Sequence, residues 1–269
     1  MILYFAKYEG AGNDFVVIDA RGFEFNPPPE FIATLCDRHF GIGADGLMSL
    51  CFTTRADFRM RYYNSDGHEA SMCGNGGRCI ALFAHHVGIS GRTKRFVGAD
   101  GEHSARIVRS DDCSGIVELQ MRDVQNIISD GDHYQLDTGS PHYVTFVEDT
   151  DSIDVVAVGR KLRNSITGGT NVNFVQITGP DSIKIRTYER GVENETYACG
   201  TGATACAIAT HLHTRSDKTR YTVQTLGGRL SVNFTPESDG RYTHIFLTGE
   251  AKKVFCGKIE LNNLKLKSK

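Results

Sequence analysis

Residues 73–76 read CGNG and residues 199–202 read CGTG, and each motif leads into an apolar run, Ile80–Ala84 after the first and Ala205–Ala209 after the second. A strand-like stretch precedes each motif, Met60–Asn64 in one case and Ile185–Glu189 in the other. The two motifs lie 126 positions apart, and a weaker pair upstream, GNDFV from residue 12 and GSPHYV from residue 139, has an offset of about 127. Self-similarity at one fixed offset indicates a duplicated structural unit.

The two apolar runs are hydrophobic nearly all round, which is typical of a buried helix. Two further segments, Pro29–His39 and Asp154–Asn164, have amphipathic helical spacing at equivalent places in the two halves. Most other segments have the alternation or the β-branched and aromatic enrichment of strands. The predicted strands are residues 15–19, 57–63, 102–108, 116–121, 143–147, 173–178, 182–188 and 221–225, with a hairpin at 226–229 leading into 230–234. The sequence therefore predicts an α+β fold of two similar halves, each an antiparallel-rich sheet around one central helix, with the seam near Asp123–Gly131.

The composition is that of an ordinary globular protein. The 269 residues are 40% hydrophobic and 23% charged, which allows a core to form without disulfides or metal. The formal net charge is −2 and the longest basic run is RTKR at residues 92–95, so the usual electrostatic signal for nucleic acid or anionic membranes is missing. Charges at Lys7 and Glu9 come too early for a signal peptide, and Thr196–Thr214 is too polar for a membrane span. We therefore expect a cytoplasmic protein with a small-molecule partner, no nucleic-acid partner and no membrane partner.

Cys73 and Cys199 each stand where a helix is expected to begin, with glycine beside them. A sulfur at that position lies over backbone N–H groups and the positive end of the helix dipole, which favours the thiolate of a group whose pKa is ordinarily about 8.5. The glycines let a ligand approach closely and offer N–H donors to a carboxylate. If two such sites face each other across a cleft, one thiolate could remove the α-proton of an amino acid while the other thiol protonates the opposite face. The chemistry predicted is racemisation or epimerisation.

The remaining cysteines read as small buried hydrophobic residues: Cys36, Cys51, Cys79, Cys113, Cys206 and Cys256. The spacing of Cys36 and His39 would suit zinc ligands, but no paired Cys-x-x-Cys accompanies it, so no metal site is predicted. The GIGADG run at residues 41–46 resembles part of a dinucleotide fingerprint, but it lacks the strand before and the apolar helix after that such a site needs.

Six motifs in this order resemble the diaminopimelate epimerase family: GNDF at 12–15, RHFGIGADG at 38–46, NSDG at 64–67, CGNGGRC at 73–79, YERG at 188–191 and ACGTG at 198–202. The resemblance covers nearly the whole chain, and the full CGNGxRC form distinguishes this family from its proline racemase-like relatives. It implies a cofactor-independent, PLP-independent isomerase that interconverts LL- and meso-diaminopimelate, in lysine biosynthesis and, in bacteria, on the route to peptidoglycan precursors.

The resemblance also implies a homodimer and two pseudo-symmetric domains, each a barrel-like, mostly antiparallel sheet around a central helix. The predicted domains are residues 1–122 and 123–253, with a C-terminal strand, residues 254–269, returning to the first domain.

The same resemblance implies roles for individual residues. Cys73 and Cys199 are the acid and the base. The helix-start N–H groups that hold the reacting α-carboxylate belong to Gly74, Asn75, Gly200 and Thr201. The residues that read the distal end of the substrate are Asn64, Asn171 and Arg190, of which the arginine suits a carboxylate because its planar guanidinium can donate two parallel hydrogen bonds. Asn13 and Glu189 match residues near the reacting ammonium group.

Two positions depart from the family pattern. The family often has Asn where this chain has Ser140, just before Pro141 and His142, and some relatives have Gln where this chain has Gly46. Ser140 and His142 are further candidate contacts, with Ser140 reaching the substrate through water. These departures bear on substrate preference rather than on the two-thiol chemistry.

Other functions remain open at this point. Another amino-acid racemase or epimerase of the same architecture is one, although Arg190 favours a substrate with a second charged end. A cysteine hydrolase is another. In that case His85 is excluded as the base, because it lies twelve residues along the helix from Cys73, about 18 Å away, whereas His142 could serve. A non-catalytic binding protein is a third, against which the two cysteines argue. The sequence does not determine which thiol is deprotonated at rest.

Overall fold

The computed structural model describes residues 2–71 and 73–260, and the chain divides into two compact units. Unit 2 is Gln120–Gly249, and unit 1 contains the described residues before and after it. The domain limits at residues 122/123 and 253/254 stay a prediction. Of the predicted C-terminal strand, residues 261–269 lie outside the described residues.

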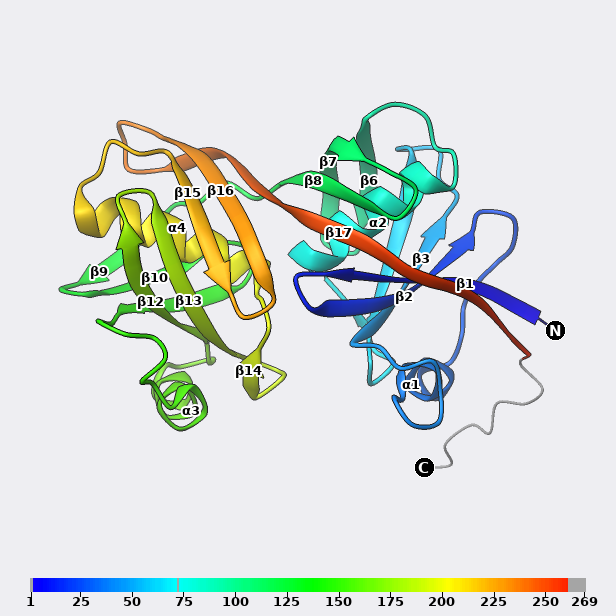
Figure 1. Cartoon of the computed structure of the whole chain (residues 1–269), viewed down its shortest axis with the longest axis horizontal. Helices are drawn as coiled ribbons and strands as arrows, with labels where there is room; N and C mark the ends of the chain where they lie inside the picture. Colours follow the sequence, from blue (N-terminus) through cyan, green and yellow to red (C-terminus); the bar gives the residue numbers. More distant parts are fainter. Residues whose placement is uncertain (1, 72, 261–269) are drawn as a thin grey trace. The chain divides into compact units, whose positions relative to one another are not determined.

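Unit 1 is a closed barrel of strands around the helix α2 (Figure 1). Hydrogen-bonded neighbours follow the order β8-β17-β1-β2-β3-β4-β6-β7, where β17 is the last strand of the chain (Tyr242–Glu260), and β7 pairs with β8 to close the barrel. The elements of this unit are β1 (Ile2–Gly10), β2 (Asn13–Ala20), α1 (Pro29–Cys36), β3 (Gly46–Cys51), β4 (Phe58–Asn64), β5 (Glu69–Ala70), α2 (Gly74–His86), β6 (Thr93–Gly98), β7 (Gly101–Ser110) and β8 (Ser114–Gln120). Residues 74–84 of α2 are all buried, which confirms the burial expected for its apolar run Ile80–Ala84.

Unit 2 repeats this plan around the helix α4. Its strands follow the order β9-β10-β11-β12-β13-β15-β16-β17, and α4 contacts β10 to β13, β15 and β16. The elements are β9 (Ile128–Asp130), β10 (His133–Asp137), β11 (Pro141–Phe146), α3 (Val155–Ser165), β12 (Asn171–Gly179), β13 (Ser182–Glu189), β14 (Asn194–Thr196), α4 (Gly200–Thr214), β15 (Arg220–Thr225) and β16 (Gly228–Pro236). The α+β class and the two barrel-like repeats around central helices are therefore confirmed.

The repeat extends to strand direction and register. Most pairs are antiparallel, and the parallel pairs fall at the same places: β2–β3 and β4–β6 in unit 1, β11–β12 and β13–β15 in unit 2. Phe15 pairs with Gly46 on β2–β3, and His142 pairs with Asn171 on β11–β12. Because side chains alternate along a strand, equal registers place equivalent residues on the same side of each sheet. Residues of unit 1 can thus be compared one by one with their counterparts in unit 2.

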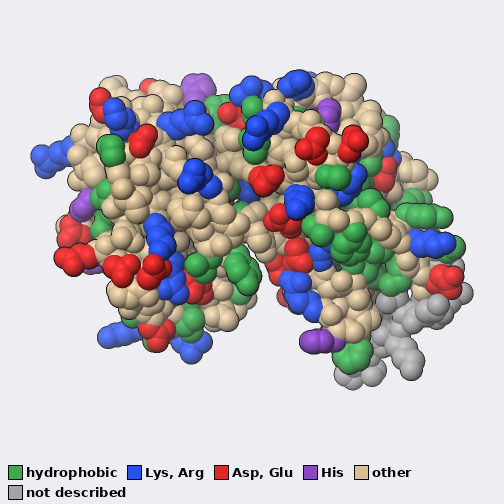
Figure 2. Space-filling view, in the orientation of Figure 1, with side chains coloured by type: hydrophobic (Ala, Val, Ile, Leu, Met, Phe, Trp, Pro, Cys, Tyr) green, Lys and Arg blue, Asp and Glu red, His purple; other side chains and the backbone are tan. Residues whose placement is uncertain are grey.

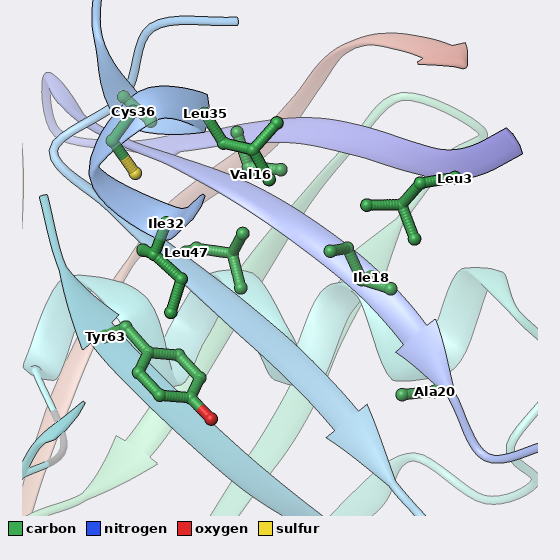
Figure 3. Close-up of a cluster of buried hydrophobic side chains, with 10 residues drawn as sticks. Leu3, Val16, Ile18, Ala20, Ile32, Leu35, Cys36, Leu47 and Tyr63 are labelled. Atoms are coloured by element: carbon green, nitrogen blue, oxygen red, sulfur yellow. The ribbon is translucent and has the colours of Figure 1, made fainter. Parts of the chain in front are cut away.

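The amphipathic helix α1 covers one part of the core of unit 1. Ile32 and Leu35 of α1 pack with Val16 of β2 and Leu47 of β3, as Figure 3 shows, and all four side chains are fully buried. The predicted helix Pro29–His39 is three residues too long, because the Asp37 carboxylate accepts hydrogen bonds from the backbone N–H groups of residues 39 and 40 and turns the chain. The helix expected at 154–164 is α3, which begins one residue later because Asp154 is its N-cap.

The last strand, β17 (Tyr242–Glu260), runs from unit 2 into unit 1. It pairs with β16 up to Gly249, then with β8 from Glu250, and finally with β1 as far as Glu260. The hairpin predicted at residues 226–229 is confirmed, since β15 and β16 are joined by the two-residue turn Leu226–Gly227.

Among the described residues, none of the helices has the length and apolar character needed to cross a membrane. On the face shown in Figure 2, basic and acidic side chains are interspersed over both units. That distribution agrees with the small net charge of the chain.

Candidate active site

Cys73 is the N-cap of α2. Its backbone is extended, with φ −90° and ψ 133°, and its carbonyl oxygen accepts the first helical hydrogen bond from Gly77 at 2.7 Å. The N–H groups of residues 74–76 precede that bond and point out of the helix start, where an anion can bind them. A Cβ at Gly76 would lie 3.2 Å from the sulfur of Met48, so glycine lets the helix start pack closely on the sheet. The half-buried thiol donates to Asn13 Oδ1 at 3.5 Å.

A network of charged side chains holds Asn13. Asn13 Nδ2 donates to Asp45 at 2.6 Å, and Arg38 bridges Asp45 and Asp14. Lys7 forms a further ion pair with Asp14 at 2.7 Å. Burial alone would raise the pKa of Asp14, but the hydrogen bonds from Arg38 and Lys7 outweigh it and lower that pKa to about 2. The Asp14 carboxylate therefore stays ionised, and the hydrogen bond to Asp45 fixes the direction of the Asn13 amide.

Arg78 is a fully buried cation one turn into α2. It donates to the carbonyl oxygen of Gly74 at 3.2 Å and to Asn75 Oδ1 at 2.9 Å. Burial lowers its pKa, against the opposing effect of Cys79, Cys73 and Glu9. Arg78 thus fixes the side chain of Asn75 and the carbonyl oxygen of Gly74 at the start of α2.

Cys199 is the N-cap of α4, with φ −117° and ψ 114°. Its sulfur accepts from the N–H of Gly202 at 3.4 Å and lies 3.3 Å from the hydroxyl of Thr201. A Cβ at Gly202 would approach Asn173 Oδ1 to 2.5 Å, so this helix start also requires glycine. The equivalent position and conformation of the two cysteines confirm that both stand at helix starts.

Behind Cys199 lies a chain of buried polar side chains. Thr201 Oγ1 is 2.9 Å from His142 Nε2, and His142 Nδ1 is 3.1 Å from Asn173 Nδ2. Asn173 Oδ1 in turn accepts from the hydroxyl of Thr187 at 3.0 Å. Burial, with a smaller effect of Arg190, lowers the pKa of His142 to about 3, so this imidazole is neutral. Both ring nitrogens of His142 are hydrogen-bonded and its pKa lies far below that of an ordinary imidazole, so it is poorly suited to accept a proton as the base of a cysteine hydrolase.

The residues expected to bind the distal end of the substrate lie at strand ends. Asn171 donates to Ser140 Oγ at 2.8 Å and to the carbonyl oxygen of Pro141 at 3.0 Å, and its Oδ1 accepts from the backbone N–H of Arg190 at 2.9 Å. The side chain of Arg190 is exposed and donates to the carbonyl oxygens of Gly168 and Gly169. Unit 2 thus brings together Ser140, Asn171 and the backbone of Arg190.

Two more predicted residues, one in each unit, also lie at strand ends. Glu189, the last residue of β13, accepts from the hydroxyl of Thr196 at 2.9 Å. In unit 1, Asn64 is exposed at the end of β4 and pairs with Gly46 of β3. A Cβ at Gly46 would lie 2.7 Å from the ring of Tyr62, so the ring occupies the space that a longer side chain would need.

The other cysteines differ in burial, and two of them, Cys79 and Cys206, lie within α2 and α4. Burial raises the pKa of Cys36 to about 12 and also raises that of Cys79 and Cys206, whereas Cys113 and Cys256 are exposed and Cys51 is half-buried. The prediction that all six are buried was therefore wrong for the last three. His85 and His86 lie in the last turn of α2, the opposite end from Cys73. Within residues 2–71 and 73–260, no three His, Cys, Asp or Glu side chains form a group that could hold a metal ion.

Sequence reasoning did not assign roles to two groups of residues. The first is the ion network of Lys7, Asp14, Arg38 and Asp45, of which three were noticed only as parts of motifs and Lys7 only as an early charge. The second is the buried pair Asn173 and Thr187. A usable signal existed for Asn173, because a polar amide at a core-facing position of a buried strand requires a specific partner.

The family model for diaminopimelate epimerase matches residues 5–127 and 134–254. The chain is 45% identical to the diaminopimelate epimerase of Flavobacterium psychrophilum over 93% of its own length and 97% of that protein. It is 40% identical to the enzyme of that name from Chlorobaculum tepidum, over 94% of this chain and 99% of the relative.

Solved structures show the same fold at much lower identity. A phenazine biosynthesis protein of the PhzF family from Bacillus anthracis matches with a TM-score of 0.76 at 14% identity, over 97% of this chain and all of the other. A hydroxyproline epimerase from Agrobacterium vitis matches with a TM-score of 0.72 at 15% identity, over 97% and 93% of the two chains. The chain thus has the fold of the class of two-unit proteins to which these structures belong. Within that class, the chain belongs to the diaminopimelate epimerase family.

Proposed function

We propose that this protein interconverts LL-diaminopimelate and meso-diaminopimelate by two-base proton transfer at the α-carbon. One cysteine acts as a thiolate that removes the α-proton, and the other acts as a thiol that protonates the opposite face. The single observation that carries the proposal is that Cys73 and Cys199 are both N-caps, at equivalent starts of the buried helices α2 and α4. The relatives named diaminopimelate epimerase, matched over nearly their full length, support the substrate.

The helix starts supply what the developing carbanion needs. The reacting α-carboxylate would be held by the N–H groups of Gly74, Asn75, Gly200 and Thr201. Fixed N–H donors and the positive helix ends stabilise negative charge as it spreads onto that carboxylate. The Arg78 contacts with Gly74 and Asn75 support this role, because they hold the first turn of α2 in place.

The two ends of the substrate require different binding residues. Arg190 is proposed to bind the distal carboxylate, since its guanidinium is exposed at the end of β13 and can donate two parallel hydrogen bonds. Asn64 and Asn171 are proposed to complete the binding site for the distal end. Asn171 contributes by hydrogen-bonding to the backbone of Arg190 and to the hydroxyl of Ser140. Asn13 and Glu189 are assigned to the reacting ammonium group. Their carbonyl and carboxylate oxygens are acceptors, which a cation requires.

The proposed reaction needs no metal and no pyridoxal phosphate. Acidity at the α-carbon is to come from the N–H groups around the carboxylate, and the proton is to move between sulfur and carbon. We further propose a cytoplasmic location and a role in lysine biosynthesis.

We also propose that the protein is a homodimer. Figure 2 shows hydrophobic side chains gathered on unit 1. The exposed apolar residues of this unit include Tyr4 of β1 and Val254 and Phe255 of β17, and these two strands pair with each other. Exposed apolar groups that lie together are typical of an interface. Sedimentation of the purified chain should give twice the monomer mass, and Tyr4→Glu should shift it towards monomer without unfolding it. A monomeric wild-type chain would contradict the proposal.

The activity is tested by incubating the purified chain with LL-diaminopimelate and separating the stereoisomers by chiral chromatography. We expect meso-diaminopimelate to form until both isomers are present at equilibrium. Parallel incubations with L-proline and trans-4-hydroxy-L-proline test the proline racemase-like alternative. Inversion of either proline substrate without any conversion of diaminopimelate would overturn the proposed substrate.

A further inference from the structure

Arg78 is a buried cation whose hydrogen-bond acceptors are neutral. Its guanidinium donates to the carbonyl oxygen of Gly74 and to Asn75 Oδ1, and its Nε has no hydrogen-bond partner within the part of the chain that the structure describes. The backbone of β1 covers the guanidinium, since a Cβ at Gly10 would lie 3.5 Å from one of its terminal nitrogens. Burying a charge is strongly unfavourable unless an opposite charge compensates it. An arginine at this place is therefore favoured by an anion nearby.

The side chains around the guanidinium do not provide a permanent anion. Cys79, Cys73 and Glu9 act on Arg78, in that order of strength. Burial raises the pKa of Cys79, which is therefore a neutral thiol, and the charge of Cys73 changes during the proposed reaction. Glu9 is half-buried, and its carboxylate accepts from the N–H of Gly12 at 3.2 Å. The first turn of α2 contains no acidic residue, so the cation and the positive end of the helix both favour an anion bound at the start of α2.

Arg78 acts on the helix start through one peptide group. The carbonyl oxygen of Gly74 and the N–H of Asn75 belong to the same peptide group, so a donor bound to that oxygen polarises the group and makes the N–H a stronger donor. A charged donor has a larger effect than a neutral one. The N–H of Asn75 is one of the groups proposed above to hold the reacting α-carboxylate.

Unit 2 has the same arrangement with a neutral donor. Thr204 is the fifth residue of α4, as Arg78 is of α2, and both side chains are fully buried. The Thr204 hydroxyl donates to the carbonyl oxygen of Gly200 at 3.0 Å, and this carbonyl shares a peptide group with the N–H of Thr201. The two helix starts thus have a side-chain donor at the same place, and in unit 1 that donor is charged.

We infer that Arg78 and Thr204 are positioning residues that strengthen the N–H donors of Asn75 and Thr201, and that the charge of Arg78 makes the start of α2 the stronger of the two sites for the α-carboxylate. The inference rests on the proposed function, in which these N–H groups hold that carboxylate. As a thiolate takes the α-proton, the C–H electron pair stays on the substrate and spreads onto the carboxylate, whose negative charge grows. Arg78 therefore stabilises the transition state more than the bound substrate.

Steady-state kinetics with LL-diaminopimelate tests the effect of the charge. Arg78→Met removes the charge at similar size and should lower kcat/KM about tenfold or more, mainly through kcat, because the lost interaction is strongest in the transition state. Arg78→Lys keeps a cationic donor and should retain more activity than Arg78→Met. Thermal unfolding verifies that each variant is folded, and Arg78→Gln replaces Arg78→Met if that variant is not.

A matched pair of threonine variants tests the polarised peptide group. Thr204→Val removes the hydroxyl that donates to Gly200 and should lower kcat/KM about two- to tenfold. The control Thr210→Val removes a hydrogen bond of the same kind, from Thr210 to the carbonyl oxygen of Cys206 at 2.7 Å, in the interior of α4. It should leave kcat/KM unchanged, because the peptide group it acts on lies away from the helix start.

Anion binding is tested without turnover by thermal unfolding of the substrate-free protein, with inorganic sulfate in place of chloride at equal ionic strength. Sulfate should raise the unfolding temperature of the wild type and of Arg78→Lys more than that of Arg78→Met, since a bound anion stabilises the folded state. The general stabilising effect of sulfate is common to all variants, so the comparison removes it.

Equal loss of kcat/KM in Arg78→Lys and Arg78→Met, or equal stabilisation of the wild type and Arg78→Met by sulfate, would overturn the role of the charge. Equal kcat/KM in Thr204→Val and Thr210→Val would overturn the role of the peptide group. Failure of the proposed function is distinguishable from both. Sulfate stabilisation that depends on Arg78, in a protein that does not epimerise diaminopimelate, refutes only the function. Epimerisation that is unchanged in Arg78→Met refutes only the inference.

Discussion

Arg38 binds both carboxylate oxygens of Asp14, with its two terminal nitrogens at 3.0 and 2.8 Å. The side chain of Asp14 is 19% exposed and also pairs with Lys7, whose side chain is 7% exposed. This pairing holds the beginning of β2, and with it Asn13, in front of Cys73. The ion network therefore links the stability of unit 1 to the geometry of the candidate site.

We predict that Asp14→Asn destabilises the protein by about 1–3 kcal/mol near neutral pH, because two cations lose a charged partner. The folded-state pKa of Asp14, about 2, lies below its ordinary value of 3.8, so its contribution is present above pH 4 and is lost as the pH falls towards 2. Urea unfolding at pH 7 and pH 3 measures the difference. The control Asp239→Asn removes an exposed pair with Arg241 and should have no measurable effect. Equal destabilisation by both variants would contradict the network's role.

Cys73→Ala and Cys199→Ala should each abolish epimerisation while the protein stays folded. Each thiol is the base in one direction and the acid in the other, so either loss should lower kcat by about 10³-fold or more. The matched control is Cys113→Ala, which removes an exposed thiol and should leave turnover unchanged. Turnover near the wild-type rate in either active-site variant would exclude the two-thiol mechanism.

Arg190→Lys should lose most activity although the charge is kept. An ammonium group cannot reproduce the two parallel hydrogen bonds of a guanidinium, so kcat/KM should fall about tenfold or more. Arg241→Lys, at an exposed ion pair, serves as the control for a general effect of the substitution. Steady-state kinetics with LL-diaminopimelate measures both, and an unchanged kcat/KM in Arg190→Lys would mean that another residue reads the distal carboxylate.

Removal of metal should leave the rate unchanged. Protein treated with chelator and dialysed is expected to keep full activity, and it should show no absorbance of a bound pyridoxal group, because the proton is transferred between sulfur and carbon. Activity that disappears on dialysis and returns with added zinc or pyridoxal phosphate would require a different mechanism.

The fold class could be predicted from the sequence because the patterns that determine it are local and occur in both halves. Two Cys-Gly-x-Gly motifs at one offset predicted both buried helices, and alternation predicted eight strands. Strands β1, β3, β6 and β10, the short strands β5, β9 and β14, and the first part of β17 were not predicted. In β3 the cause is clear, since five of its six residues are fully buried and show no alternation. The end of α1 depended on hydrogen bonds from the Asp37 side chain, which a helical pattern does not reveal.

The sequence identified candidate site residues but not the contacts that set their chemistry. Motifs identified Asn13 and His142 as candidates, but not the direction of their hydrogen bonds. For Asn13 that direction depends on Asp45, 32 residues away, and for His142 on Asn173, 31 residues away. Contacts between distant strands of one sheet set the chemistry of these side chains, so sequence reasoning could not distinguish the surroundings of Cys73 from those of Cys199.

The most direct measurement of the two-base claim is deuterium incorporation during the reaction of LL-diaminopimelate in deuterated water. Two thiols that titrate as a pair should give a bell-shaped pH profile of kcat/KM, and the reaction is run at its maximum. The protonating thiol carries solvent deuterium, whereas the abstracted proton stays on the other sulfur. Early in the reaction, meso product should contain deuterium at the inverted carbon while recovered LL substrate remains largely unlabelled. Equal labelling of both isomers would mean that a single base serves both faces, and would contradict the mechanism.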